Sequence, residues 1–276
     1  MSAIAFTDVT VELGTRRILS GVSFGVEPGE FVGVMGPNGA GKTTMMRAIL
    51  GLLPAASGQI EVLGGPPRRG NAAIGYVPQS RRIPQHSGII GSELLLSAHG
   101  GERWGIPWSS ATDRKGVAAA LDRVGATDLA RRPVAELSGG ERQRLFIAQA
   151  LVGVPRLLLL DEPLISLDPA RQRSIVELVH AVSRELGIAV LFTAHEINPL
   201  LRAVDRVLYL GSGHAAIGTV DQVIDEQVLS NLYRTQVRVI RTSGRIFVIA
   251  EDGSAVDGEG GHHHHDHDDH EHAHED

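Results

Sequence analysis

A glycine-rich stretch constrains the fold of this chain more than any other part of it. It reads Gly36-Pro37-Asn38-Gly39-Ala40-Gly41-Lys42-Thr43-Thr44. Residues 30–35 before it are apolar and predict a buried strand, and residues 45–50 after it predict a helix. Glycine tolerates the backbone angles of a sharp turn, so the N–H groups of such a loop converge on one point at the start of the helix. The stretch therefore predicts an anion-binding site between a strand and a helix.

The anion that fits this loop is the triphosphate of a nucleotide. Glycine, any four residues, glycine, lysine, and then serine or threonine is the spacing of the phosphate loop of nucleoside triphosphatases. Lys42 supplies a full positive charge for the β- and γ-phosphates, and the Thr43 hydroxyl is placed to ligate Mg²⁺. The alternative is a glycine-rich turn that happens to precede a lysine, and the strand and helix on either side disfavour it.

Two adjacent acids follow an apolar run later in the chain. Residues 157–160 are four leucines, which predict a strand buried on both faces, and Asp161 and Glu162 come directly after it. In open α/β sheets, ligands bind at the carboxyl ends of the strands, where this pair would lie. We expect Asp161 to hold Mg²⁺, directly or through water, and Glu162 to polarise the attacking water. An acidic pair can also cap a helix, but the phosphate loop earlier in the chain favours the metal and base roles.

Predicted strands and helices alternate along most of the chain. The predicted strands are 4–13, 18–26, 30–35, 58–63, 73–78, 156–160, 188–193 and 206–210. The predicted helices are 45–50, 92–98, 113–124, 139–152, 170–186 and a short one that ends at 204. This alternation predicts an α/β fold with a mostly parallel core sheet, an N-terminal antiparallel β subdomain and a helical insertion.

The predicted organisation has three parts. Residues 1–220 form a nucleotide-binding domain, whose helical subdomain covers about 80–151. Residues 221–252 form a small appendage, with a helical piece followed by a hairpin of strands 236–241 and 245–250. Residues 253–276 are a tail rich in histidine and aspartate that cannot form a core, so we expect it to be disordered.

A second motif predicts another anion site. It reads Leu137-Ser138-Gly139-Gly140-Glu141-Arg142-Gln143-Arg144, with Ser138 as a helix N-cap and two glycines that expose N–H groups at the helix start. Ser-Gly-Gly alone is also typical of an ordinary capped helix. The full octet, shortly before the Asp-Glu strand, resembles the signature motif of ATP-binding-cassette (ABC) ATPases. The resemblance covers residue 3 to about residue 220 and implies a phosphate-loop nucleoside triphosphatase (P-loop NTPase) fold.

The resemblance implies roles for three more residues. Gln79 resembles the Q-loop glutamine, which senses Mg²⁺ and water and links the ATPase to its transmembrane partner. His195 resembles the switch histidine that contacts the γ-phosphate. Asp168 resembles the D-loop aspartate at the seam of the dimer. Without the resemblance, Gln79 and His195 would be read as ordinary polar residues.

The resemblance also implies that the active site belongs to a pair of chains. Two copies pair head to tail, so that ATP held by the phosphate loop of one is capped by the signature residues of the other, which are Ser138, Gly139, Gly140 and Glu141. Leu13 occupies the place where the family usually has an aromatic residue that stacks on adenine, which puts tight adenine selectivity in doubt. Leu164 replaces a threonine often found after Glu-Pro, and we assign it no catalytic consequence.

The tail carries a separate ligand pattern. Residues 262–276 contain six acids and eight histidines, which are His262, His263, His264, His265, His267, His270, His272 and His274. Imidazole and carboxylate groups are ligands of Zn²⁺ and similar ions, so the tail predicts a site for Zn²⁺ or Mn²⁺. An expression tag and a merely solvated tail are the alternatives, but tags rarely interleave aspartate and glutamate as this segment does.

The composition excludes several classes of protein. The chain has no cysteine, which excludes disulfides, thiolate metal sites and cysteine nucleophiles. The net charge of −6 comes from the tail, since the rest of the chain has 26 basic and 26 acidic residues. We find no basic block interleaved with aromatic residues and expect no nucleic-acid partner. We find no secretory signal, and the longest apolar runs, 157–160 and 188–192, are too short to span a bilayer, so any membrane link goes through a partner.

Our leading hypothesis is an ATP-hydrolysing transporter subunit at the cytoplasmic face of the cell membrane. The chain resembles the zinc and manganese uptake branch of the family in the segment 74–79 and in its short appendage. The resemblance implies a second copy, a polytopic permease docked by the helical insertion and, indirectly, an extracytoplasmic substrate-binding protein. The alternatives are an ABC ATPase for a lipid, drug or polysaccharide, with the tail a tag or metal buffer, and a soluble ATP-dependent clamp, which would need long coiled coils or two cassettes.

Overall fold

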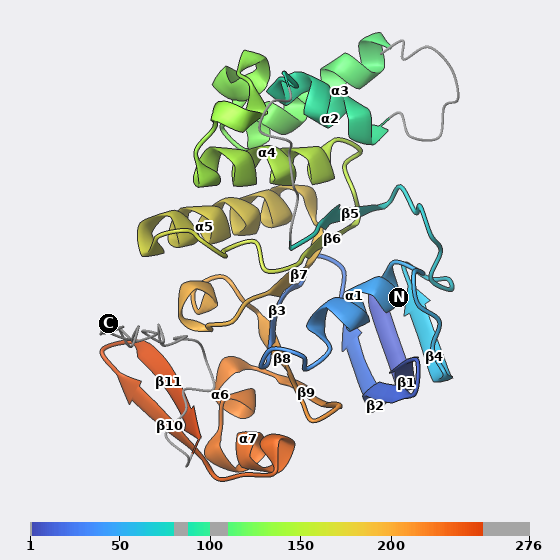
Figure 1. The fold of residues 1–276 in the computed structure, drawn as a ribbon, viewed down its shortest axis with the longest axis vertical. Helices are drawn as coiled ribbons and strands as arrows, with labels where there is room; N and C mark the ends of the chain where they lie inside the picture. Colours follow the sequence, from blue (N-terminus) through green and yellow to red (C-terminus); the bar gives the residue numbers. More distant parts are fainter. Residues whose placement is uncertain (1, 80–87, 100–109, 251–276) are drawn as a thin grey trace, which may run out of the picture.

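The computed structural model describes residues 2–79, 88–99 and 110–250, and within this part the strands form three sheets (Figure 1). The largest has six strands in the order β5-β6-β7-β3-β8-β9. Its members are β3 (Phe31–Met35), β5 (Ile74–Val77), β6 (Leu157–Leu160), β7 (Ala189–Thr193), β8 (Arg206–Gly211) and β9 (His214–Gly218). All neighbours are parallel except β9, which pairs antiparallel with β8. The predicted α/β fold with a mostly parallel core sheet is confirmed.

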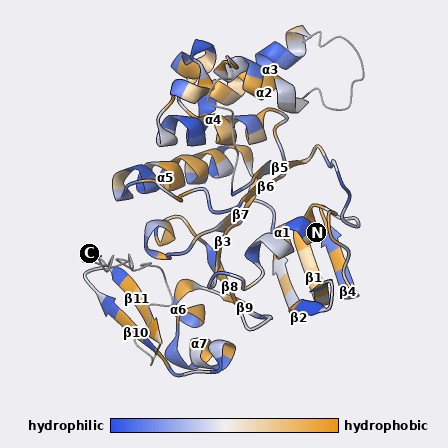
Figure 2. Ribbon diagram, viewed as in Figure 1, coloured by the Kyte–Doolittle hydropathy of each residue, from blue (hydrophilic) through white to orange (hydrophobic). Residues whose placement is uncertain are grey.

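The central strands are buried because their residues face two hydrophobic cores in turn. Every residue of β3, β6 and β7 is buried. Along β6, Leu157 and Leu159 pack in one core, while Leu158 and Leu160 pack in the other. A strand alternates its side chains between the faces of the sheet, so an unbroken apolar run is what a strand covered on both faces requires. Figure 2 shows the hydrophobic colour along these strands.

An antiparallel sheet covers one side of the phosphate loop. It has the order β2-β1-β4, with β1 (Ile4–Leu13), β2 (Arg16–Val26) and β4 (Ser57–Val62). Helix α1 (Lys42–Ile49) lies beside it (Figure 1), and its residues Met45 and Met46 are buried in the core that this sheet shares with β3 and β6. The strand that follows α1 in the sequence, β4, belongs to this antiparallel sheet. The next strand, β5, lies at one edge of the core sheet.

Helices cover the other face of the core sheet. Helix α5 (Pro169–Leu186) lies next to it, and α4 (Gly139–Leu151) packs against α5 and β5. Helices α2 (Gly91–His99) and α3 (Ala111–Arg123), with the short 3-10 turns Thr127–Arg131 and Val134–Glu136, form an outer layer on α4 (Figure 1). None of the helices in the described ranges is both long enough and apolar enough to cross a membrane.

The C-terminal elements pack against β8 and β9 of the core sheet and against the turn that follows β7. They are α6 (Val220–Val223), α7 (Glu226–Tyr233) and the hairpin β10 (Val237–Thr242) and β11 (Arg245–Ala250). The Asn198 side chain bonds both the N–H and the carbonyl oxygen of Ile246, at 2.8 and 2.9 Å. The helix expected to end at 204 is a 3-10 turn over Asn198–Leu200. Strand β9 was not predicted. The tail lies outside the described residues.

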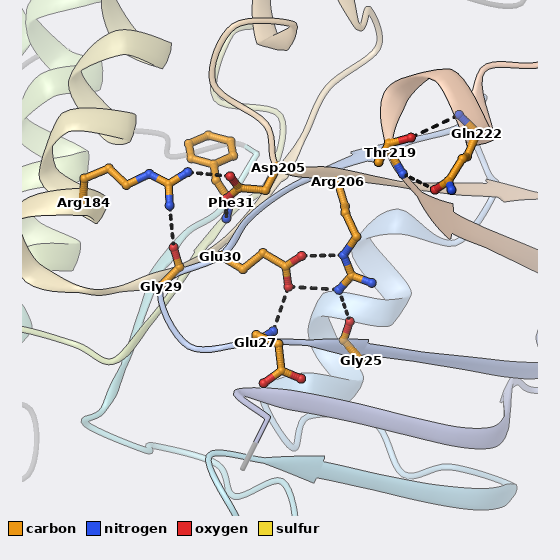
Figure 3. A network of polar contacts seen from close by, with 10 residues as sticks. All are labelled: Gly25, Glu27, Gly29, Glu30, Phe31, Arg184, Asp205, Arg206, Thr219 and Gln222. Atoms are coloured by element: carbon orange, nitrogen blue, oxygen red, sulfur yellow. Dashed lines mark hydrogen bonds and ion pairs between the residues drawn. The ribbon is translucent and has the colours of Figure 1, made fainter.

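Charged side chains at the amino edge of the core sheet bind one another (Figure 3). Arg206, at the start of β8, donates from Nη2 to Glu30 Oε2 at 2.9 Å and to the carbonyl oxygen of Gly25 at 2.7 Å. Asp205 accepts from the Phe31 N–H at 2.8 Å and from Arg184 Nη2, at the end of α5, at 2.6 Å. These contacts join the starts of β3 and β8 to α5 and to the end of β2.

Candidate functional site

The residues expected to carry chemistry lie at the opposite, carboxyl edge of the core sheet. The phosphate loop follows β3, Gln79 follows β5, the acidic pair follows β6, and His195 follows β7. These four strands are parallel neighbours, so their carboxyl ends open at one edge. The site is thus assembled from segments that are far apart in the sequence.

Two glycines shape the phosphate loop. Gly36 has φ 136°, and a Cβ there would overlap the carbonyl oxygen of Leu210 at the end of β8. Gly41 has φ 104°, and a Cβ there would lie 3.0 Å from the side chains of Ile18 and Leu19. Both the backbone angle and the close neighbours require glycine. The loop can therefore bend tightly and bring N–H groups to the start of α1.

Lys42 is the first residue of α1, and its side chain turns back over the loop. The residue is only 4% exposed. Its Nζ donates to the carbonyl oxygen of Gly36 at 2.6 Å and to that of Pro37 at 3.3 Å, and it lies 3.5 Å from Glu162 Oε1. A buried ammonium needs hydrogen-bond acceptors and a counter-charge, and the loop and Glu162 supply both.

Glu162 is the point where the predicted residues meet. Glu162 is 7% exposed, and its Oε2 accepts a hydrogen bond from Gln79 Nε2. His195 Nε2 lies 3.0 Å from the same oxygen. Together with Lys42 on Oε1, three donors from three different strand ends surround one carboxylate. The structure thus brings Lys42 and Glu162, which their own motifs predict, together with Gln79 and His195, which only the family resemblance assigns.

Asp161 is buried and incompletely bonded. Burial raises the pKa of its carboxyl group, and the hydroxyls of Thr43 and Thr193 oppose this rise. Oδ1 accepts from Thr193 Oγ1 at 3.2 Å, while Oδ2 makes no hydrogen bond with any described residue. A buried carboxylate oxygen without a partner is costly unless a cation binds it, so this oxygen beside Thr43 fits the expected Mg²⁺ site.

The signature residues lie in a different part of the chain from the phosphate loop. Ser138 caps α4, accepting from the Glu141 N–H at 3.4 Å, and Glu141 Oε2 accepts from the Ser138 N–H at 2.8 Å. These bonds and Arg132, 2.6 Å from Glu141 Oε1, lower the pKa of Glu141 to about 2. In Figure 1 α4 belongs to the helical layers and α1 to the side of the antiparallel sheet, so the two motifs do not face one another within the chain.

Gly139 and Gly140 differ from the glycines of the phosphate loop. Neither has a positive φ. A Cβ on Gly139 would lie 3.5 Å from Leu167, and one on Gly140 would lie 3.4 Å from Arg171, which are contacts that a side chain can accommodate. A pocket of about 240 Å³ opens beside them, lined among others by Ser138, Gly140 and Arg171. Among the described residues, no backbone angle and no close contact with a Cβ requires glycine at these two positions.

The remaining predicted residues are placed as follows. Asp168 caps α5, accepting from the N–H groups of Ala170 and Arg171 at 3.1 and 3.0 Å. Leu13 ends β1 and is 40% exposed, so its side chain is available at the surface. The histidines of the tail lie outside the described residues. Within the described part, no three acids or histidines form a cluster that could hold a metal ion.

One functional candidate was missed by the sequence reasoning. Thr193, the last residue of β7, is fully buried and contacts both acids of the pair. The only sequence signal is a hydroxyl at the end of an apolar strand, two residues before His195. A threonine in a strand is common and would not draw notice on its own.

Comparisons with known proteins agree with this arrangement. The ABC transporter family profile matches residues 19–165. The zinc import ATP-binding protein ZnuC of Cereibacter sphaeroides is 38% identical over 219 residues, covering 79% of this chain and 83% of the relative. ZnuC 1 of Hahella chejuensis is 35% identical over 233 residues, covering 84% of each chain. An inward-facing structure of a proposed metal-chelate type ABC transporter has a TM-score of 0.76 at 25% identity, covering 90% of this chain and 96% of that chain.

Proposed function

This chain belongs to the ABC transporter family and is an ATPase, and we propose that it energises the import of a divalent metal ion, zinc or manganese, across the cytoplasmic membrane. The observation that carries the ATPase mechanism is the surrounding of Glu162. Its carboxylate contacts the phosphate-loop lysine, Gln79 and His195. A base held at the phosphate loop by three donors is placed to act on a water beside the γ-phosphate.

The proposed reaction needs one proton acceptor and one charge clamp. The water oxygen bonds to the γ-phosphorus while the bond from that phosphorus to the bridging oxygen breaks, so that ADP and phosphate leave. Glu162 takes the water proton, and His195 steadies the carboxylate from Nε2. Lys42 and the N–H groups of the phosphate loop bind the β- and γ-phosphates. Mg²⁺, when bound, neutralises phosphate charge, and Thr43, Asp161 and Gln79 are the residues that would hold it.

The signature residues are proposed to act on the nucleotide of a second copy. A Cβ on Gly139 or Gly140 would meet the described residues of its own chain only at ordinary contact distances, so the absence of a side chain there is more useful to a ligand brought by a second copy than to the fold of the chain itself. Glycines at a helix start let a phosphate approach the N–H groups closely. Ser138, Gly139 and Gly140 would thus cap the ATP bound at the partner's phosphate loop, with Glu141 fixing the start of α4 and Asp168 at the seam. Leu13 would cover the adenine without stacking.

The names of the relatives and the composition of the tail support the proposed cargo and location. The relatives that match over about four fifths of this chain carry the name zinc import ATP-binding protein. The eight histidines and six acids of residues 262–276 are suited to binding Zn²⁺ or Mn²⁺. We propose that the chain sits at the cytoplasmic face of the membrane against a polytopic permease, which receives metal from an extracytoplasmic substrate-binding protein. In this division, residues 1–220 hold the ATPase, 221–252 the appendage and 253–276 the tail.

Metal uptake by cells that express the full chain with its natural partners tests this function. A strain lacking the chain is supplied with wild type, Glu162→Gln or Glu177→Gln, and the uptake of radioactive zinc and manganese is measured. Glu177 is exposed on α5, away from the carboxyl edge, and serves as the matched control. We expect Glu162→Gln to lower uptake to the level of the strain without the chain and Glu177→Gln to retain it. Uptake that does not depend on the chain for either metal would reject metal import.

A further inference from the structure

The Thr193 side chain lies between the two acids that follow β6. Thr193 is 0% exposed, and its strand, β7, lies between β6 and β3. On the β3 side, Thr193 pairs with Val34, and the next N–H, that of Ala194, donates to the Val34 carbonyl oxygen at 3.1 Å. The backbone of this threonine is therefore fixed to the strand that leads into the phosphate loop.

A hydroxyl group has one proton and two lone pairs, and the surroundings of Thr193 use both functions. Its Oγ1 accepts from the Glu162 N–H at 2.6 Å. Its proton has two acceptors in reach, Asp161 Oδ1 at 3.2 Å and the Leu160 carbonyl oxygen at 3.4 Å. A carboxylate is the stronger acceptor, so the proton is best used on Asp161.

The bond to the Glu162 N–H holds an unusual backbone. Glu162 has φ 50°, in the left-handed region that is unfavourable for residues with a Cβ. With this backbone, its side chain contacts Lys42, Gln79 and His195. A strained residue at a site persists only where its surroundings hold it, and the Thr193 hydroxyl is the group that binds the strained N–H.

The bond to Asp161 sorts the two oxygens of that carboxylate. Oδ1 is occupied by Thr193, which leaves Oδ2 as the buried oxygen without a hydrogen bond from the described residues. One hydroxyl thus binds both the carboxylate of the acid that fits Mg²⁺ and the backbone of the acid that fits the base. Thr43 also acts on Asp161, and other donors hold the Glu162 carboxylate, but the Thr193 hydroxyl bonds both acids directly.

We infer that Thr193 is a positioning residue for ATP hydrolysis, which sets Glu162 and Asp161 relative to one another and to the phosphate loop. This inference rests on the proposed role of Glu162 as the base. Thr193 itself does not touch the reacting atoms. Its loss misplaces the base and the metal ligand without removing either, and a misplacement of about 1 Å can cost about 100-fold in rate.

The test separates the hydroxyl from the bulk of the side chain. Thr193→Val has the same shape but no hydroxyl, and Thr193→Ser keeps the hydroxyl but loses the buried methyl. Ser183→Ala is a matched control, since Ser183 is also buried and, among the described residues, its hydroxyl bonds the His180 carbonyl oxygen within α5 and neither acid of the site. The measurements on the full-length chain are kcat, KM for ATP, the Mg²⁺ concentration for half-maximal rate, and thermal stability.

We expect Thr193→Val to lower kcat by about 10-fold to 100-fold, with a much smaller change in KM and a higher Mg²⁺ requirement. Thr193→Ser should keep kcat within about threefold of wild type although it is less stable, which is the rescue that a packing role does not produce. Ser183→Ala should change stability and leave kcat alone. A kcat that follows stability across all three variants, or a Thr193→Val enzyme with wild-type kcat and Mg²⁺ requirement, would overturn the inference.

Glu162→Gln is measured in the same assay to keep the two proposals apart. If Glu162→Gln is inactive while Thr193→Val is fully active, the base stands and only the positioning role fails. If Glu162→Gln hydrolyses ATP at the wild-type rate, the proposed mechanism itself fails. Should Thr193→Val not fold, Thr193→Ala is compared with Thr193→Ser, because these two variants differ only in the hydroxyl. Equal kcat values for that pair would overturn the inference.

Discussion

The two edges of the core sheet both carry charged side chains that bind one another, but the charges at the two edges are satisfied differently. At the amino edge, Arg206 binds Glu30, and Arg184 binds Asp205 (Figure 3). At the carboxyl edge, Glu162 adopts a strained backbone, and Asp161 keeps an oxygen without a hydrogen bond from the described residues. Charges that complete one another within the chain stabilise the fold. A buried charged group that keeps an oxygen without a hydrogen-bond partner indicates a ligand site.

The same difference appears in the pKa values. Hydrogen bonding to Glu30 raises the pKa of Arg206, so this pair favours its charged state. Burial raises the pKa of Asp161, so this carboxylate is held in a state that its surroundings do not fully support. A cation at Asp161 would supply what the chain does not. We therefore call the amino edge of the sheet the structural edge and the carboxyl edge the functional edge. Substitutions at the two edges should have different effects on stability and on hydrolysis.

Glu162→Gln, at the functional edge, should have the largest effect. Removing the proposed base should lower kcat by about 100-fold to 10,000-fold. The amide keeps the shape of the side chain, so ATP binding should be retained, but the free energy of unfolding should fall because the buried Lys42 loses its counter-charge. Steady-state hydrolysis, nucleotide binding and denaturant unfolding measure these three quantities. A large loss of stability without a loss of kcat would show that Glu162 stabilises the fold, like the charges of the amino edge, and does not act in hydrolysis.

Arg206→Ala, at the structural edge, should do the opposite. The variant leaves the mostly buried Glu30 without its partner. A hydrogen bond to a charged group contributes about 1.5 to 3 kcal/mol to the free energy of unfolding. We expect the free energy of unfolding to fall by that order and kcat to stay within about twofold of wild type. Arg184→Ala is the matched control, because its ion pair with Asp205 is more exposed and should contribute about 1 kcal/mol or less. A variant that is stable but inactive would contradict the assignment of this edge.

Glu141→Ala should have a smaller effect that depends on pH. Glu141 is bonded within its own chain like the charges of the structural edge, and these bonds lower its pKa from 4.5 to about 2. A lowered pKa means that Glu141 stabilises the fold above pH 4.5 and that this contribution disappears as the pH falls from 4.5 towards 2. The stability difference between wild type and variant should therefore be constant near neutral pH and shrink on acidification. A difference that grows on acidification would show that the sign is wrong.

Local patterns predicted most elements of the fold and, at the site, the phosphate loop and the acidic pair, whereas Gln79 and His195 were predicted only through the resemblance. Apolar runs marked the strands that lead to the phosphate loop and to Asp161, since full burial leaves little choice of residue type. They did not reveal β9, because His214–Gly218 is a short edge strand that is mostly half-buried. They also missed the Arg206–Glu30 pair, whose members are 176 residues apart. The N–H of Glu162, whose backbone is left-handed, bonds the Thr193 hydroxyl, and no local pattern contains this contact between strands.

The central claim is that each chain holds only half of a nucleotide site. It is tested most directly by the oligomeric state of Glu162→Gln with ATP, alone and combined with Gly140→Asp. A Cβ on Gly140 fits within its own chain, so the second change should leave the fold intact but bring a negative charge to the partner's phosphates. We expect analytical ultracentrifugation to find an ATP-dependent dimer for Glu162→Gln and a monomer for the double variant, with ATP bound in both. An equally stable ATP-dependent dimer of the double variant would contradict the shared site.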